Sequence, residues 1–212
     1  SWCLRVMNTD NVAIENINMI HWDLNGDGID LCTVTGATIN DCMLRAYDDC
    51  ITLKVRSNAD PYGNVHDIRI TNCIIWGDYA RGIVVGPECG NVWWASGDIR
   101  NIEIRNCTVL EAARGQALAI MQELGDFSEA GGPALIDNVL FGHHVVGNRG
   151  TYTADCIRYV LNRQRMQNWV LYECDFARQF EYGWTQETLL SALFSIATPL
   201  ADYMWVTDTS VY

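Results

Sequence analysis

Short alternations of apolar and polar residues recur along the chain and predict its secondary structure. Each segment of one series alternates for a few positions and ends in Asn or Asp before a small apolar residue: 37–42, 68–73, 102–107 and, more weakly, 134–139, with a degenerate earlier copy at 14–19. A second series falls between them: 28–32, 49–53, 81–85, 116–120 and 155–159. Alternation with a period of two is typical of half-buried β-strands. The chain is therefore expected to be all-β.

The two series interleave, and each recurs at intervals of roughly 20 to 40 residues. Such a recurrence predicts a solenoid, in which the strands of successive coils pair in parallel and equivalent residues stack on one another. We expect about six coils over residues 1–185. The repeat is lost from about residue 186, so residues 186–212 are predicted to form a short helical or irregular C-terminal cap or tail.

Cysteines occupy equivalent positions in the first series. Cys42, Cys73 and Cys107 would form an inward column, and the preceding residues, Asp41, Asn72 and Asn106, would lie at bends, where short polar side chains satisfy the turn backbone. Buried thiols that act as small apolar groups are favoured over disulfides. None of the nine cysteines forms a Cys-x-x-Cys pair, so a zinc ribbon is not expected.

Composition excludes several classes of partner. The formal net charge is −12, with no cluster of Lys and Arg that could follow a phosphate backbone or anchor the chain on an anionic membrane. No apolar run reaches the roughly 20 residues that span a bilayer. The 212 residues are enough for one sizeable core. Because the chain begins at Ser1 with strand-like sequence and no secretory signal, we interpret it as a mature product or a portion of a longer protein.

The candidate chemistry lies in two acidic clusters, at residues 25–30 and 47–50. Asp48 follows Asp27 by 21 positions, which is close to the length of one coil, and Asp49 is its neighbour. One coil returns the chain to the same wall about 4.8 Å higher, so three acids would gather in one patch. Like charges held together raise the pKa of one another, which is the condition that general acid catalysis requires. The alternative for each cluster alone is an ordinary turn or a solvated strand end.

At these residues the sequence resembles glycoside hydrolase family 28, the polygalacturonase-type hydrolases. The family has an Asn-x-Asp-Gly motif followed one coil later by Asp-Asp-Cys, matched here by Asn25, Asp27 and Gly28 and then by residues 48–50. The resemblance covers roughly residues 10–121 and implies a right-handed parallel β-helix that cleaves a glycosidic bond with inversion, outside the cell or in the periplasm. It implies that Asp48 is the general acid and that Asp27 and Asp49 hold and deprotonate the water, with Asn25 orienting Asp27 or capping the turn.

Two family motifs are altered. The Gly-His-Gly motif of the next coil is Ala80-Arg81-Gly82 here, and Arg81 could replace the histidine by stabilising a carboxylate or by binding a sugar hydroxyl. The Arg-Ile-Lys motif, which in the family binds the substrate carboxylate, is Ala119-Ile120-Met121. The expected substrate is therefore a carbohydrate other than a galacturonate polymer.

Further residues are candidates for substrate binding. Trp93 and Trp94 lie in a polar loop bounded by glycines and could stack on sugar rings, or they could only pack the loop. Lys54 is among the few cations available near the acids. His143 and His144 are adjacent in a strand and point to opposite faces, so no metal is expected there. Neither a cofactor nor a metal is expected.

Two other functions remain open. A polysaccharide lyase could hold calcium with the three acids and use Arg81 as its base, because calcium takes about six to eight oxygen ligands. A carbohydrate-binding or structural β-helix with an inactive site would belong to a different class, and the altered motifs favour it.

Overall fold

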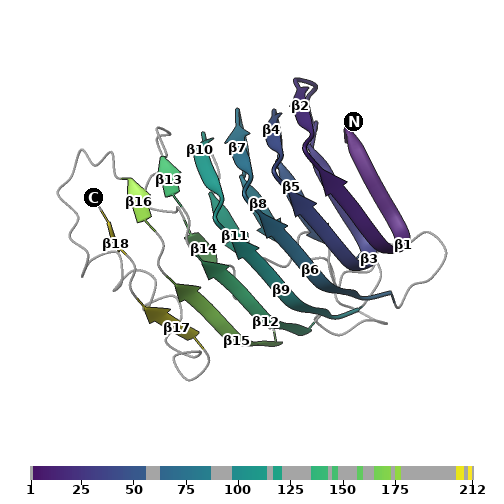
Figure 1. Ribbon diagram of the computed structural model, residues 1–212, viewed down its shortest axis with the longest axis vertical. Helices are drawn as coiled ribbons and strands as arrows, with labels where there is room; N and C mark the ends of the chain where they lie inside the picture. The colour runs from purple at the N-terminus through teal and green to yellow at the C-terminus, as the bar shows by residue number, and fades with distance from the viewer. Residues whose placement is uncertain are drawn as a thin grey trace, which may run out of the picture.

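The fold is described by a computed structural model. It covers residues 2–55, 63–86, 97–113 and 117–120, and after these the strands at 135–142, 145–147, 157–159, 165–172, 175–177, 204–207 and 210–211. Every regular element in these ranges is a β-strand (Figure 1). Within them, no helix is long and apolar enough to cross a membrane.

The strands form two sheets. The larger sheet contains β1 (Leu4–Glu15), β3 (Ile29–Asn40), β5 (Ile51–Lys54), β6 (Val65–Thr71), β8 (Ile83–Val85), β9 (Ile99–Arg105), β11 (Leu118–Ile120), β12 (Leu135–Gly142), β14 (Ile157–Tyr159), β15 (Arg165–Tyr172) and β17 (Met204–Thr207). The smaller sheet contains β2 (Asn18–His21), β4 (Met43–Ala46), β7 (Ile74–Gly77), β10 (Thr108–Ala112), β13 (Val145–Gly147), β16 (Asp175–Ala177) and β18 (Ser210–Val211).

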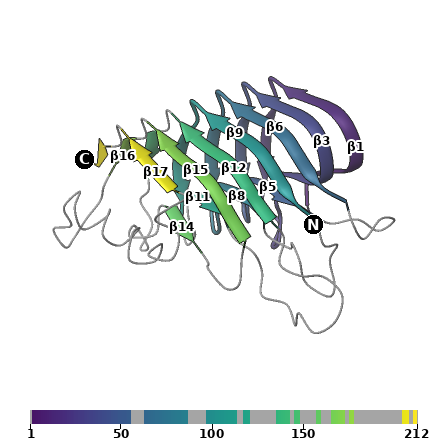
Figure 2. The same ribbon diagram turned by 90° about the horizontal axis from the view of Figure 1, so that it is seen from below.

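All strand pairs are parallel, and each strand pairs with its counterpart from the next repeat. The long strand β3 joins two walls of the larger sheet, because its first residues pair with β5 and its last residues pair with β6. The sheet is therefore curled rather than flat, as Figure 2 shows. This arrangement confirms the predicted all-β, parallel β-helical fold.

The predicted number of coils stays a prediction. The predicted boundary at residue 186, between the β-helix and a C-terminal tail, also stays a prediction. Strands β17 and β18 fall within the proposed tail and continue the two sheets by pairing with β15 and β16. The rest of residues 186–212 lies outside the described residues, as does the predicted loop with Trp93 and Trp94.

Asparagine and aspartate residues bend the ribbon at equivalent positions of successive repeats. Asp41, Asn72 and Asn106, the residues predicted to lie at bends, have left-handed φ angles of 55°, 57° and 52°. Asn106 Nδ2 donates a hydrogen bond to Asn72 Oδ1 at 2.5 Å, and Asn72 Nδ2 donates to Asn40 Oδ1 at 2.9 Å. Short polar side chains tolerate this backbone conformation and hydrogen-bond locally, so the bends stack as a ladder.

The core is a stack of aliphatic side chains and thiols. Cys42, Cys73 and Cys107 are at most 2% exposed and carry free thiols, as predicted. Each Sγ lies within hydrogen-bonding distance of the carbonyl oxygen two residues earlier, at 3.2–3.3 Å. The parallel backbone ladders set the spacing between coils, and the column fills the interior between them.

Candidate functional site

The two acidic clusters lie on adjacent turns, where the chain passes from the smaller sheet into the larger one. Ile29 pairs with Ile51, and Ile51 pairs with Ile83. Asp27, Asp49 and Arg81 each stand two residues before one of these isoleucines. Backbone hydrogen bonds continue the pairing into the turns, since Gly28 N donates to Asp49 O at 2.9 Å and Cys50 N donates to Arg81 O at 3.0 Å. The structure thus places the backbones of the two acidic turns side by side, with Asp27 in register with Asp49.

Residue 28, which follows Asp27, is a glycine because the backbone of the next coil leaves no room for a side chain there. A Cβ on Gly28 would lie 2.4 Å from the carbonyl oxygen of Cys50, and a Cβ on Gly82 would lie 2.4 Å from the carbonyl oxygen of Ala117. Side chains do not tolerate such distances without movement of the backbone. Close approach of the coils therefore accounts for the glycine in the Asn-x-Asp-Gly motif.

Asp27 is held by a buried cation. Lys54 Nζ lies 2.7 Å from Asp27 Oδ2 and 2.8 Å from Asp30 Oδ1, and Lys54 is only 2% exposed. The ammonium also lies 3.7 Å from the centroid of the Trp2 ring. Lys54 was predicted to bind substrate. In the structure its ammonium instead contacts two carboxylates and an aromatic face.

Burial raises the pKa of Asp27 well above its ordinary value, because a carboxylate that is 3% exposed loses most of its hydration. The nearby Asp30 carboxyl raises the pKa further, and Lys54 opposes both effects. The protonation state of Asp27 is therefore set by a balance between burial and one ammonium group.

Asp49 is held by Arg81. The Arg81 backbone N–H donates to Asp49 Oδ1 at 3.0 Å, and the guanidinium lies 3.1 Å from Oδ2. The pKa of Asp49 is raised to about 6, and burial is the largest cause. Arg81 lowers this pKa and the charge of Asp48 raises it, and both effects are included in that value. Of the two roles expected for Arg81, this geometry corresponds to stabilising a carboxylate.

Asp48 and Asn25 are more accessible than Asp27, Asp49 and Lys54. Asp48 is half-buried, and its backbone N–H donates to Gly26 O at 3.1 Å. Asn25 is exposed and has a left-handed φ of 56°, which places it at the turn before Asp27. Beside them the Tyr47 and Tyr79 rings stack with centroids 5.2 Å apart, and Tyr79 is 41% exposed. The predicted general acid thus stands beside an aromatic pair.

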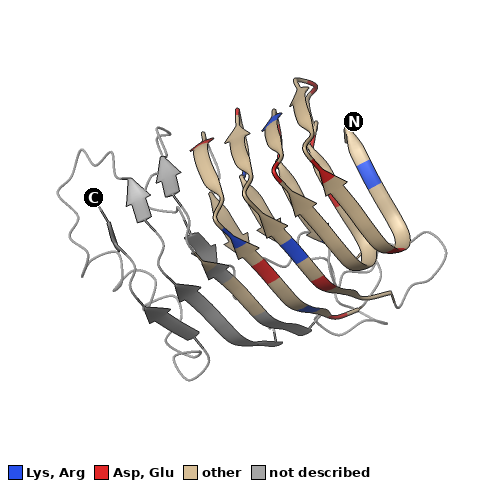
Figure 3. Cartoon of the chain, viewed as in Figure 1, with Lys and Arg blue, Asp and Glu red and all other residues tan. Residues whose placement is uncertain are grey.

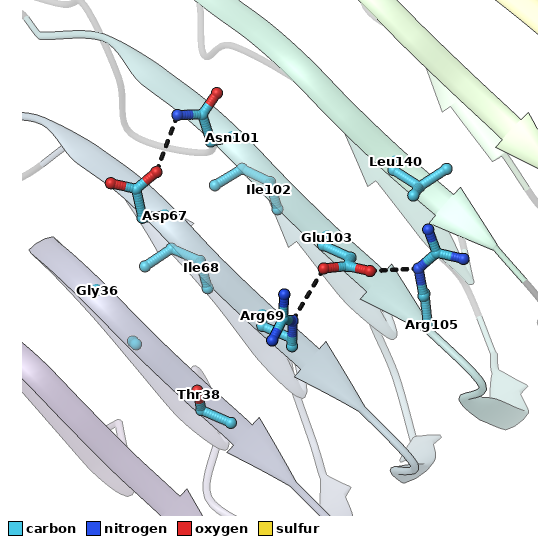
Figure 4. Close-up of a pocket in the computed structure, with 11 residues that line it drawn as sticks. Gly36, Thr38, Asp67, Ile68, Arg69, Asn101, Ile102, Glu103, Arg105 and Leu140 are labelled. Carbon is cyan, nitrogen blue, oxygen red and sulfur yellow. Dashed lines mark hydrogen bonds and ion pairs between the residues drawn. The ribbon is translucent and has the colours of Figure 1, made fainter.

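A separate groove of about 660 Å³ lies over β3, β6 and β9 of the larger sheet. Its charges are paired with one another: Arg69 Nε donates to Glu103 Oε2 at 2.9 Å, Arg105 also donates to Glu103, and Asn101 donates to Asp67 (Figure 4). The opposite charges on neighbouring strands are visible in Figure 3. Among the predicted site residues that the structure describes, none lines this groove.

The same acids are the ligands that a calcium site would use. Within the described ranges, no group of three or more His, Cys, Asp or Glu side chains is arranged to hold a metal ion. Asp27 and Asp49, which a calcium site would need, are engaged by Lys54 and Arg81. His143 and His144 lie outside the described residues.

Comparison with known families gives one match. The model of the glycosyl hydrolases family 28 matches residues 1–122. The chain belongs to this family. Searches of curated proteins and of solved structures gave no significant match. Family 28 membership supports a glycoside hydrolase acting on a carbohydrate, and the matched residues include both acidic clusters and Arg81.

Proposed function

We propose that the chain hydrolyses a glycosidic bond with inversion of the anomeric carbon. Asp48 donates its proton to the leaving oxygen, while Asp27 and Asp49 hold a water molecule and accept its proton as its oxygen bonds to the anomeric carbon. The supporting observation is the register that sets Asp27 beside Asp49, with Asp48 next to them on the more accessible side. Inverting enzymes separate their two carboxyl groups by roughly 6.5–9.5 Å, which residues on adjacent coils can meet.

Arg81 has a supporting role in this proposal. Its two contacts with Asp49 fix the orientation of that carboxylate and offset part of the cost of burying its charge. We propose a substrate without a carboxylate at the cleavage site, since Ala119 stands where the family has its arginine and is 1% exposed. We also propose that the protein acts outside the cell or in the periplasm, on family membership alone.

A second candidate is a carbohydrate-binding or structural β-helix without turnover. Asp27 and Asp49 are only 3% and 5% exposed, and each is paired with a cation. Ion-paired, buried carboxylates can serve structure alone. Binding to a glycan without release of new reducing ends, unchanged in Asp48→Asn, would support this candidate over hydrolysis.

The test is a screen of neutral and acidic plant and bacterial glycans, read by release of reducing ends. Hydrolysis is expected to continue in the presence of EDTA and to yield products without ultraviolet absorbance. An unsaturated product together with loss of activity in EDTA would instead identify a calcium-dependent lyase.

The pH dependence of the rate follows from the buried acids. Asp27 and Asp49 must be ionised to activate water, and burial raises the pKa of both, to about 6 for Asp49. As the pH falls through these values the acids take up protons, so kcat/KM should decline. The acid limb of the kcat/KM profile is expected at about pH 6 or above.

This profile can be measured between about pH 4 and about pH 9 on any substrate that the screen yields. Circular dichroism at each pH provides the control for unfolding. A rate that stays maximal down to about pH 4 would contradict the assignment of Asp27 and Asp49 as the groups that activate water.

A further inference from the structure

The closest buried contacts of the candidate site form a chain of four groups. Thr52 Oγ1 donates to Asp30 Oδ1 at 2.6 Å, Lys54 Nζ lies 2.8 Å from the same oxygen, and the ammonium lies 2.7 Å from Asp27 Oδ2. Asp30 and Thr52 are completely buried. Only Asp27 and Asp49 of this neighbourhood were assigned to water activation, so the other groups need a separate explanation.

The charges of this chain do not balance. Two carboxylates face one ammonium in a region from which water is almost excluded, and an uncompensated charge is unfavourable there. Asp30 Oδ2 is also buried and has no hydrogen-bond partner among the described residues. Lys54 is therefore the cation that compensates both carboxylates.

We propose that Lys54 is a positioning residue that fixes the Asp27 carboxylate and favours its ionised form over the protonated one, and that Asp30, held by Thr52, fixes Lys54. This inference rests on the proposed role of Asp27 in activating water. Lys54 contributes no contact with substrate in this account. It acts through Asp27, so its removal changes the protonation of Asp27 before it changes substrate binding.

Charged groups of several elements lie around Asp27. Asp30 comes from β3 and Lys54 from β5, and Arg5 on β1 pairs in register with Asp30. Further titratable or charged groups on the adjacent turns include His21, Asp23, Asp48, Asp49 and Arg81. Of all these groups, only Lys54 and Asp30 are changed in the variants below.

The experiment compares Lys54→Met, Asp30→Asn and the double variant with the wild type. Carbon-13 NMR of the aspartate carboxyl groups, with Asp27 assigned through Asp27→Asn, gives the pKa of Asp27 without reference to activity. Lys54→Met is expected to move that pKa upward by about one pH unit or more, and Asp30→Asn is expected to move it downward. The acid limb of kcat/KM should move in the same directions.

The opposite signs distinguish positioning from a merely structural role, because two destabilising changes would not move one pKa in opposite directions. Lys54→Arg keeps the charge and should restore most of the wild-type pH profile. If Lys54→Met fails to fold, Asp30→Asn alone decides: a lowered pKa of Asp27 supports the proposal, and an unchanged or raised pKa overturns it.

Failure of the proposed function gives a different result from failure of the further inference. If the pKa of Asp27 shifts in the variants but the protein hydrolyses no glycan, the contacts of Lys54 with Asp27 stand, but Asp27 activates no water. That result would overturn the positioning role. Hydrolysis with the same acid limb in wild type, Lys54→Met and Asp30→Asn would overturn the further inference while leaving the glycosidase assignment in place.

Discussion

Asp48→Asn is expected to lower turnover by at least about 10²-fold, because an amide cannot protonate the leaving oxygen. Asp27→Asn should cause a loss of similar size, because the water then loses one of its two acceptors. Both substitutions keep the shape of the side chain. The measurement is kcat on the best substrate of the glycan screen, with folding checked by circular dichroism.

Asp41→Asn provides the matched control. Asp41 is exposed at a bend with a left-handed φ of 55°, a conformation that asparagine adopts readily and that Asn72 and Asn106 adopt at equivalent positions. The turnover of the Asp41→Asn variant should equal that of the wild type. Wild-type rates in Asp48→Asn or in Asp27→Asn would end the assignment of the acid roles.

Gly28→Ala is expected to destabilise the fold by about 2–4 kcal/mol, a large loss for one methyl group. The added Cβ would lie 2.4 Å from the carbonyl oxygen of Cys50, so the two coils must move apart at the position that sets Asp27 beside Asp49. Urea unfolding gives the change in the free energy of unfolding. Activity measured well below the unfolding midpoint should also fall, because the acids separate with the coils.

Ala80→Gly is a suitable control for Gly28→Ala. Ala80 is half-buried on the turn of the next coil and already carries a Cβ, so its loss should change stability by no more than about 1 kcal/mol. Equal stability of Gly28→Ala and wild type would show that the coils are not in close contact at the acidic turns.

Much of the fold could be predicted from the residue pattern. The recurrence of segments such as 68–73 and 102–107 indicates stacked parallel strands, and it also predicts the buried column that includes Cys73. The interval of 21 residues between Asp27 and Asp48 predicts adjacent turns, because a coil of that length returns to the same wall. In both cases a local repeat determines a contact between distant residues.

The environment of the acids could not be predicted in the same way. Lys54 was predicted to bind substrate, because sequence spacing does not show which side chains are buried together. In the structure Asp30 pairs in register with Thr52, and Lys54 stands two residues further along the same strand, so the ammonium reaches back to both carboxylates. Only the register between β3 and β5 could have indicated this contact.

The contribution of Trp2 was also missed, since a tryptophan at the start of the chain carries no pattern. Its ring lies 3.7 Å from Lys54 Nζ and provides a cation–π contact for the buried ammonium. Such contacts depend on how one strand crosses its neighbours and have no local sequence pattern.

The anomeric configuration of the first product, followed by proton NMR during the initial minutes of hydrolysis, tests the pairing of Asp48 with Asp27 and Asp49 most directly. A product that first appears with the anomer opposite to that of the substrate, and then mutarotates, is expected from water activated across the ring from Asp48. A product that first appears with the substrate's own anomer would require a covalent intermediate on one of the carboxylates, and would contradict the account.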